Sequence, residues 1–469
     1  MEKDSIDMTK TLENTQAAET PTRTSLPDWL NQRDIDEVEC VAADAAGIAR
    51  GKVLPADKFV QAVSDDHLRI AESLFSQDVQ GRTIDAGVVA VQEPDINLQP
   101  DLSTLRVLPW RQGRVASVIC DAREDNGEAS DLVPRQALRT VIEHFAALGF
   151  KATVAPEFEF YIAELHSDPN LPLARPILSN GARESGQQSY GVDILQEYAG
   201  LIDSIYAYGK ALGVNIDVLT HEAGPGQFEI NLKHGDPLAA ADQTFMFKRL
   251  ARAAAAEHGK TITFMAKPVA DQPGNAMHIH QSVYAIETGD NVFVDAEGRN
   301  HDNLYHYIGG LQKYIPALLP MFAPFINSYR RFVRNAFAPV TTHWGYENRT
   351  VGLRIPASEP ANRRVENRVI GADANPYLAI AATLACGLLG MRQRLSPSRE
   401  MTGSAYAAKS LFLPEDLLSA LGNMKKCKAL GDVFSPRFLT LYWELKYAEY
   451  KDFMATITPW EREHLLTQI

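Results

Sequence analysis

The chain has 469 residues, of which 45% are hydrophobic and 22% are charged, and its formal net charge is -13. A chain of this length is too long to fold around one simple hydrophobic core, so at least two domains are predicted. The negative balance argues against nucleic acid and anionic membranes as partners, and it suits a cationic substrate. The cysteines form no Cys-x-x-Cys pair, which argues against a disulfide framework or a thiolate zinc site and fits a reducing compartment.

Residues 1–30 are predicted to form a disordered tail, because they are rich in Thr, Glu and Lys and contain no apolar signal-peptide core. Residues 377–390 are the most apolar run, but this run is too short to span a bilayer and fits a buried helix better. These features together predict a cytoplasmic protein without a membrane partner.

Residues 31–130 are predicted to form a small N-terminal domain. Its first part, 36–55, has the pattern of two strands joined by a turn at Asp44, where one interpretation of the carboxylate is an Asx-turn. Further strands are expected near 88–91 and 114–120, and the charged segment 121–130 has the composition of an exit linker.

A helix is predicted to begin at Pro134 and to end at Gly149, and a strand follows over 154–161. In this strand Glu157 and Glu159 share one face, opposite apolar side chains. The two carboxylates lie about 7 Å apart by the rise per residue. They repel each other unless a cation lies between them, although a solvated strand face is the alternative interpretation.

The same alternation returns in four later segments, which are separated by a predicted loop over 165–190 and helices near 195–212 and 242–258. Each segment carries such functional groups, and in two of the segments the groups lie two residues apart on one face. The groups are Glu229, preceded by Glu222; His278, His280 and Ser282; Arg349 and Arg354; and Arg364, Glu366 and Arg368. A long buried helix after Pro376 and a helical C-terminal third complete the expected order.

If these strands lie side by side in one curved sheet, one face gathers carboxylates, imidazoles and guanidiniums. Such a face requires counter-ions, which hard divalent cations would supply to the carboxylates and phosphates to the arginines. This combination indicates phosphoryl transfer from ATP, outside the P-loop class because no G-x-x-x-x-G-K-[ST] motif occurs. Core histidines and structural salt bridges are the alternative interpretations.

The motifs on these strands resemble those of the glutamine synthetase superfamily, type I-like, and most closely its γ-glutamylpolyamine or γ-glutamylputrescine synthetase branch. The matching segments are PEFEFY at 156–161, PGQFEINL at 225–232, MHIH at 277–280, NSYRRF at 327–332, and RVENR at 364–368 with ADANPY at 372–377. The resemblance implies an α+β fold: a β-grasp domain over 31–130 and a catalytic domain over 131–469 built on a curved antiparallel sheet flanked by helices. It also implies a homo-oligomer, a dodecamer with active sites between subunits.

The resemblance implies a role for each matching position. Two metal sites would be formed by Glu159, Glu222 and Glu229, and by Glu157, His278 and Glu366. The ATP site would include His280, Ser282, Arg354 and Arg364, and the glutamate site Gly274, Arg331 and Arg368. Arg349 would face the transferred phosphoryl group, and Asp44 of a neighbouring N-terminal domain would accept the proton of the amine.

The implied reaction uses ATP and Mg²⁺ or Mn²⁺ to phosphorylate the γ-carboxylate of glutamate, and an amine then displaces the phosphate. Ammonia-using members carry a glutamate where this chain has Phe337, so an apolar wall replaces an ammonium contact and favours a polyamine such as putrescine, or a monoamine. The family's Gly-Ser-Gly before the histidine is 274–276, Gly-Asn-Ala, here. The alternatives are an ammonia-using glutamine synthetase and a non-catalytic structural or regulatory oligomer.

Overall fold

A computed structural model describes residues 20–467 and 469, except 91, 112, 166, 167, 169 and 187. Residues 1–19 of the predicted tail lie outside the described residues. The prediction of disorder up to residue 30 is wrong for its last part, because Leu26–Asn31 forms helix α2. Leu26 and Trp29 of this helix are buried, and α2 packs against α3 (Ala56–Ser64).

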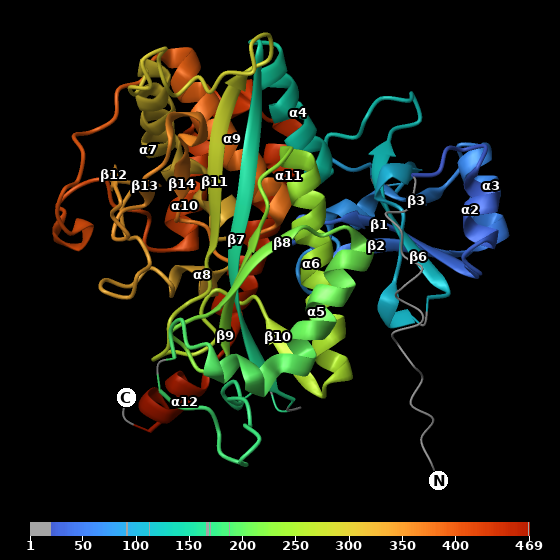
Figure 1. The fold of residues 1–469 in the computed structure, drawn as a ribbon, viewed down its shortest axis with the longest axis horizontal. Helices are drawn as coiled ribbons and strands as arrows, with labels where there is room; N and C mark the ends of the chain where they lie inside the picture. Colours follow the sequence, from blue (N-terminus) through green and yellow to red (C-terminus); the bar gives the residue numbers. More distant parts are fainter. Residues whose placement is uncertain are drawn as a thin grey trace.

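The N-terminal part forms a six-stranded sheet in the order β2-β1-β6-β4-β3, with β5 also paired to β6 (Figure 1). Its strands are β1 Glu37–Ala43, β2 Ala49–Pro55, β3 Arg69–Ala71, β4 Asp95–Pro100, β5 Arg106–Val107 and β6 Val115–Arg123. The β1–β6 pair is parallel and the other pairs are antiparallel. The predicted strand near 88–91 is wrong over 88–90, which is loop; β4 begins at 95 instead.

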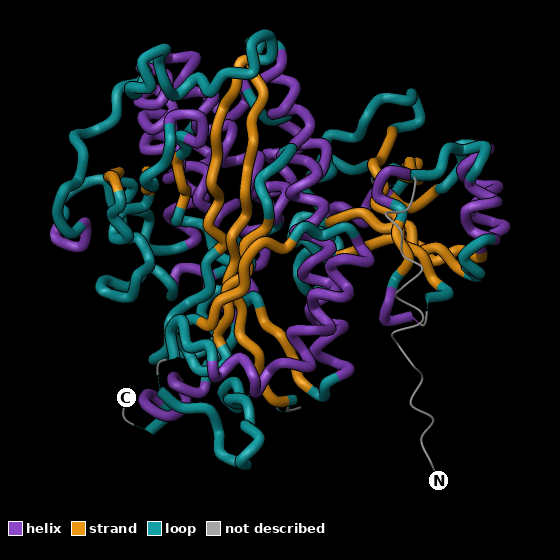
Figure 2. Tube along the Cα trace, viewed as in Figure 1, coloured by secondary structure: helices purple, strands orange, loops and turns teal. Residues whose placement is uncertain are grey.

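The second sheet has eight strands in the order β12-β13-β14-β11-β7-β9-β8, with β10 also paired to β7 (Figure 2). They are β7 Phe150–Glu164, β8 Ile216–His221, β9 Gln227–Leu232, β10 Lys260–Thr263, β11 Met277–Ala285, β12 Trp344–Tyr346, β13 Leu353–Ile355 and β14 Val365–Asn367. All pairs except β12–β13 are antiparallel. The predicted α+β organisation is therefore confirmed, while the β-grasp assignment stays a prediction.

Helices pack against one face of this sheet and against each other (Figure 1). They are α4 Pro134–Ala146, α5 Ala199–Leu212, α6 Pro237–Glu257, α7 Asp302–Phe322, α8 Ile326–Tyr329, α9 Pro376–Gln393, α10 Leu417–Lys426, α11 Pro436–Ala455 and α12 Pro459–Leu465. Short 3₁₀ helices occupy 72–76, 102–104, 109–111, 193–198, 360–362, 405–407 and 428–432. None of the helices in the described part is long and apolar enough to cross a bilayer.

Strand β7 separates the core from the opposite face of the sheet. The Phe158 and Phe160 rings lie 4.8 and 6.1 Å from the ring of Phe247 on α6, measured between centroids. Because side chains alternate along a strand, this packing turns Glu157 and Glu159 to the other face. The apolar side of β7 therefore fixes where the carboxylates point.

A buried arginine joins the two domains. Arg135 on α4 is 2% exposed, and its guanidinium donates to Asp101 and Asp121 of the N-terminal domain at 2.8 and 2.7 Å. It also forms two hydrogen bonds with Asp242 on α6, at 3.0 and 2.8 Å. Burial acts to lower the pKa of Arg135, but these carboxylates more than offset it and the pKa is raised. The domains are thus held by a network whose charges compensate one another.

Candidate active site

The register of the second sheet places the polar residues side by side. His278 on β11 lies opposite Glu157 on β7, and Glu159 lies opposite Glu229 on β9. On the other side of β11, Glu366 of β14 lies opposite both His280 and Arg354. Directly opposed side chains in an antiparallel pair lie about 5 Å apart. The pairing thus brings together residues up to 209 positions apart in sequence, from Glu157 to Glu366.

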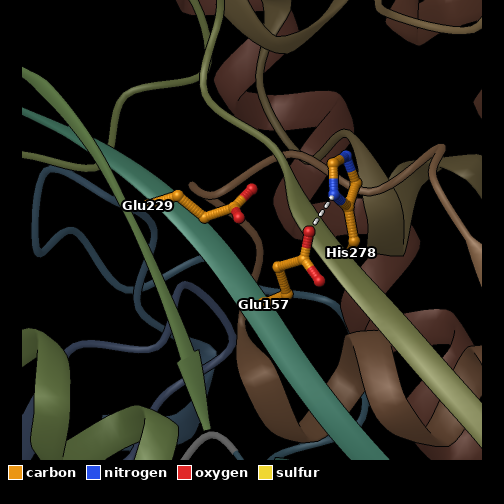
Figure 3. Close-up of side chains that lie close together, drawn as sticks. All are labelled: Glu157, Glu229 and His278. Atoms are coloured by element: carbon orange, nitrogen blue, oxygen red, sulfur yellow. Dashed lines mark hydrogen bonds and ion pairs between the residues drawn. The ribbon is translucent and has the colours of Figure 1, made fainter. Parts of the chain in front are cut away.

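Two groups of these side chains are compact enough to hold a metal ion. The ligand atoms of Glu157, Glu229 and His278 lie within 4.8 Å of one another, and so do those of Glu157, His280 and Glu366. Figure 3 shows Glu229 and His278 directed toward Glu157 from the two flanking strands. Glu157 belongs to both groups. The geometry therefore divides these residues differently from the predicted ligand sets, which kept Glu157 and Glu229 apart and left out His280.

The carboxylates on the β9 side are crowded, and burial outweighs the effect of the arginines near them. Burial, together with the charge of Glu222, raises the pKa of Glu159 to about 8. Burial and the charges of Glu157, Glu159 and Glu222 raise the pKa of Glu229 to about 10. Burial also raises the pKa of Glu222. Glu159 and Glu229 are therefore mostly protonated at pH 7, and a bound cation would restore their charge.

On the β11 side, by contrast, hydrogen bonds with histidines outweigh the effect of burial on the carboxylate of Glu157. Burial acts to raise the pKa of Glu157, but hydrogen bonds with His278 at 3.4 Å and His280 at 3.1 Å more than offset it and the pKa is lowered. Burial and the charge of Arg368 lower the pKa of His278 to about 4, so its imidazole is neutral and free to bind a metal. Carboxylate oxygens with one or two imidazoles form a donor set that fits Mg²⁺ or Mn²⁺.

Two cavities meet at this cluster. The larger has a volume of about 810 Å³ and the smaller about 350 Å³. Both are lined by Tyr190, Glu222, Glu229 and Arg349. Molecules bound in the two cavities would therefore lie next to each other at the cluster, as group transfer between two bound substrates requires.

The larger cavity holds the residues predicted to contact ATP: His280, Ser282, Arg354 and Arg364. The guanidinium of Arg354 donates to Glu366 at 2.9 Å, and Arg364 Nε donates to His280 Nδ1 at 3.3 Å. Ser282 donates to the carbonyl of Arg363 at 2.9 Å. The arginines give this cavity the positive rim that a nucleotide's phosphates require.

The smaller cavity holds the residues predicted for glutamate: Gly274, Arg331 and Arg368. Arg331 is 3% exposed and donates to the backbone carbonyl of Val369. Burial lowers its pKa to about 10, which leaves it charged at neutral pH. A Cβ on Gly274 would lie 2.6 Å from Arg331 Cγ, so only glycine leaves this guanidinium in place. Two buried cations in a cavity suit a carboxylate ligand.

Phe337 lies at the mouth of the smaller cavity, with 72% of its surface exposed. Its φ of 55° is in the left-handed region, which side chains other than glycine rarely occupy. The next residue is held in place, because Tyr406 donates to the carbonyl of Ala338 at 3.2 Å. The segment thus presents an aromatic ring to whatever enters the cavity.

Asp44 is not brought to the site. Its carboxylate is fully buried in the β1–β2 turn and accepts hydrogen bonds from the backbone N–H groups of Ala46 and Ile48 and from Arg50, each at 2.9 Å. The Asx-turn interpretation is therefore confirmed. Within its own chain this carboxylate lines neither cavity; the predicted role of Asp44, which is to accept the amine's proton in the site of a neighbouring subunit, stays a prediction.

Two further residues belong to the site, although no role was predicted for either. Tyr190 lines both cavities from the loop before α5, and its backbone N–H donates to the carbonyl of His221 at 2.9 Å. Asn231 donates to Glu157 at 3.1 Å. Asn231 could have been found, since it alternates in phase with Glu229 on β9. Nothing in the polar loop sequence singles out Tyr190.

Comparison with known proteins agrees with this geometry. The family pattern described as "Glutamine synthetase, catalytic domain" matches residues 131–465. The chain is 34% identical over 447 residues to a glutamate–isopropylamine ligase from Pseudomonas sp., covering 92% of this chain and 95% of that one. It is 33% identical over 433 residues to the γ-glutamylputrescine synthetase PuuA of Escherichia coli strain K12, covering 92% and 91%.

Solved structures agree as well. A structure described as "Apo GmaS without ligand" superposes with a TM-score of 0.81 at 28% identity, covering 96% of this chain and all of that one. The similarity thus spans both domains and includes the strands that carry the carboxylates and histidines. The chain belongs to the glutamine synthetase family.

Proposed function

We propose that the protein is an ATP-dependent ligase that joins the γ-carboxylate of glutamate to an amine. The observation that carries this proposal is the pair of cavities that share a wall of Glu222, Glu229 and Arg349. The larger cavity is basic where ATP would bind, and the smaller one contains two buried arginines where glutamate would bind. The γ-carboxylate and the γ-phosphoryl group would then meet at the shared wall.

The carboxylate and histidine cluster would hold the divalent ions, with Glu157 common to both compact groups. When bound, Mg²⁺ would neutralise the phosphate oxygens and polarise the γ-phosphoryl group. Bound ions would also explain why Glu159 and Glu229 are clustered. The raised pKa values of these two carboxyl groups indicate that the protein alone does not fully compensate their negative charge.

In the first step, an oxygen of the glutamate γ-carboxylate attacks the γ-phosphorus of ATP, and the bond to the ADP oxygen breaks. Arg331 and Arg368 would hold the glutamate, while Arg349 in the turn between β12 and β13 lines both cavities and would stabilise charge on the transferred group. Positioning and electrostatics account for most of the acceleration in phosphoryl transfer.

In the second step, the amine nitrogen attacks the acyl carbon of γ-glutamyl phosphate, and inorganic phosphate leaves. The amine reaches the site as a cation and must lose a proton before it attacks. Glu159 and Glu222 line the smaller cavity, and in its ionised form one of them would attract this cation and take up its proton. The chain's net charge of -13 favours the same encounter.

The mouth of the smaller cavity supports an alkylamine over ammonia. It is lined by the apolar residues Pro273, Ala336, Phe337 and Ala338, together with Tyr190. An alkyl chain buries apolar surface against such a wall, and an ammonium ion has no apolar surface to bury there. The names of two similar proteins, a glutamate–isopropylamine ligase and a γ-glutamylputrescine synthetase, support the same class.

A phosphate-release assay tests the proposal. It contains glutamate, ATP and Mg²⁺ with ammonium, isopropylamine, ethanolamine or putrescine in parallel. We expect an alkylamine to give a kcat/KM at least about tenfold above that of ammonium. Highest turnover with ammonium would instead identify an ammonia-using glutamine synthetase. Absence of turnover with every amine would identify a non-catalytic member of the family. Assembly into a dodecamer stays a prediction, which sedimentation velocity measures.

A further inference from the structure

A third cavity, of about 600 Å³, lies between the N-terminal domain and α6. It shares no lining residue with the two cavities of the active site. Its walls come from the β1–β2 turn at 46–49, from Trp110, from α6, and from β10 with the residues that follow it. The reaction proposed above uses none of them.

Two cations line this cavity without a carboxylate partner. Lys248 is 9% exposed, and its ammonium donates to the carbonyls of Ala372 and Ala374 at 2.7 and 2.8 Å. An ammonium group has three N–H donors, so one is left for another acceptor. Arg252, one helical turn later, donates to the carbonyl of Lys248 at 3.5 Å. Within the described part of the chain, neither side chain forms an ion pair.

The two charges lie near the same aromatic ring. Lys248 Nζ is 5.6 Å and Arg252 Cζ is 5.2 Å from the centroid of Phe264. Burial and the charge of Arg252 lower the pKa of Lys248 to about 7. Like charges brought together in a partly desolvated wall repel each other, and a bound anion would relieve that repulsion.

The other charged groups at this cavity are already engaged. Arg249 pairs with Glu39 at 2.6 Å. Asp373 accepts a hydrogen bond from Ser328 at 2.6 Å, and burial raises its pKa, which makes it a weak counter-charge for Lys248. The remaining lining is largely apolar and aromatic: Ile48, Trp110, Phe245, Ile262, Phe264, Met265 and Phe325.

We propose that this cavity binds a small organic anion with a flat apolar part, such as an aromatic carboxylate, between Lys248 and Arg252 on one side and the aromatic side chains on the other. Charge-assisted hydrogen bonds to Lys248 and Arg252 would fix the anionic group. Apolar burial against Trp110 and Phe245 would favour a ring over an inorganic ion.

The cavity is also connected to the glutamate site. Lys248 holds the carbonyls on both sides of Asp373, and Asp373 binds Ser328, which lies three residues before Arg331. A ligand that draws the ammonium of Lys248 toward itself would loosen this segment. We expect occupancy to raise the KM for glutamate and to leave the KM for ATP unchanged.

Benzoate binding to the full-length protein tests the site, with the change in tryptophan fluorescence as the readout and saturating glutamate present to block the active-site arginines. Benzoate should change the fluorescence, while benzyl alcohol, which lacks the charge, and inorganic phosphate, which lacks the ring, should bind at least about tenfold more weakly. Trp110→Phe should abolish the signal. Arg252→Gln should weaken binding about tenfold, and the exposed control Arg299→Gln should not.

Three results would overturn the proposal: no saturable benzoate binding, equal affinity in wild type and Arg252→Gln, or an apparent Kd for benzoate that rises without a plateau as glutamate is increased, since two coupled but separate sites give a plateau. Arg252 is exposed at the cavity wall, and within the described residues it forms no ion pair with a carboxylate, so its replacement should leave folding intact. Lys248→Gln serves as a second variant, and it should also weaken benzoate binding. Because binding is measured without turnover, the result is independent of which amine the enzyme uses.

Discussion

Glu159→Gln should make the metal-free protein more stable at alkaline pH, although it removes a predicted metal ligand. Glu159 accepts a hydrogen bond from the backbone N–H of Ala276 at 2.8 Å, and a glutamine oxygen can accept the same bond. Burial and the neighbouring Glu222 raise the pKa of Glu159 to about 8, above the usual carboxyl value of 4.5. The folded protein therefore holds a proton that the unfolded chain releases.

The sign of the pH effect follows from this proton. Between about pH 4.5 and pH 8 the unfolded state binds fewer protons at this position, so stability falls as pH rises. From about pH 6 to pH 8 the loss is about 2 kcal/mol at most, since solvent reaches part of the cavity. The glutamine variant has no proton to lose at this position. Its stability should therefore exceed that of wild type increasingly over this range.

Urea unfolding in EDTA at about pH 6 and about pH 8 measures the difference. Glu128→Gln, which replaces an exposed carboxylate, is the matched control and should show no such trend. Adding Mg²⁺ should reverse the order at the higher pH, because it stabilises wild type more than the variant. A variant less stable than wild type in EDTA at both pH values would refute the account of uncompensated charge.

Arg135→Met leaves three carboxylates without their shared cation and should lower the free energy of unfolding by about 3–5 kcal/mol in urea titrations, whereas the partly exposed Arg139→Met should cost under about 1 kcal/mol. Equal losses of unfolding free energy in the two variants would contradict the role of Arg135 in joining the two domains. Gly274→Ala should displace Arg331 and raise the KM for glutamate about tenfold, while Gly403→Ala, with open space around its Cβ, should leave it unchanged. Phe337→Glu should lower kcat/KM for alkylamines about tenfold relative to ammonium; an unchanged ratio in competition assays would show that Phe337 does not select the amine.

The site could be predicted to the extent that it follows strand alternation. Glu157 and Glu159 share a phase on β7, as do His278 and His280 on β11, so the face they occupy is readable from local sequence. Which residues pair across strands depends on register, which the sequence alone does not provide. His280, which was predicted to contact ATP, lies in a compact group with Glu157 and Glu366. Strand alternation alone does not predict this group, because it depends on the register.

Other departures arise where tertiary contacts override local signals. α6 begins at Pro237, five residues before the predicted start, because the Asp236 side chain caps it by accepting from the N–H groups of residues 238 and 239. α4 begins at Pro134, as predicted, but without a side-chain cap, and Asp131 nearby pairs with Arg437. Arg437 is distant in sequence, so no local pattern predicts this pair.

The most direct test of the central claim follows the oxygen of the γ-carboxylate. Glutamate labelled with ¹⁸O in this group is incubated with ATP, Mg²⁺ and the best amine, and the released phosphate is analysed by mass spectrometry. If the γ-carboxylate attacks the γ-phosphoryl group across the shared cavity wall, one labelled oxygen should appear in each phosphate released. Unlabelled phosphate accompanied by amide formation would contradict the account.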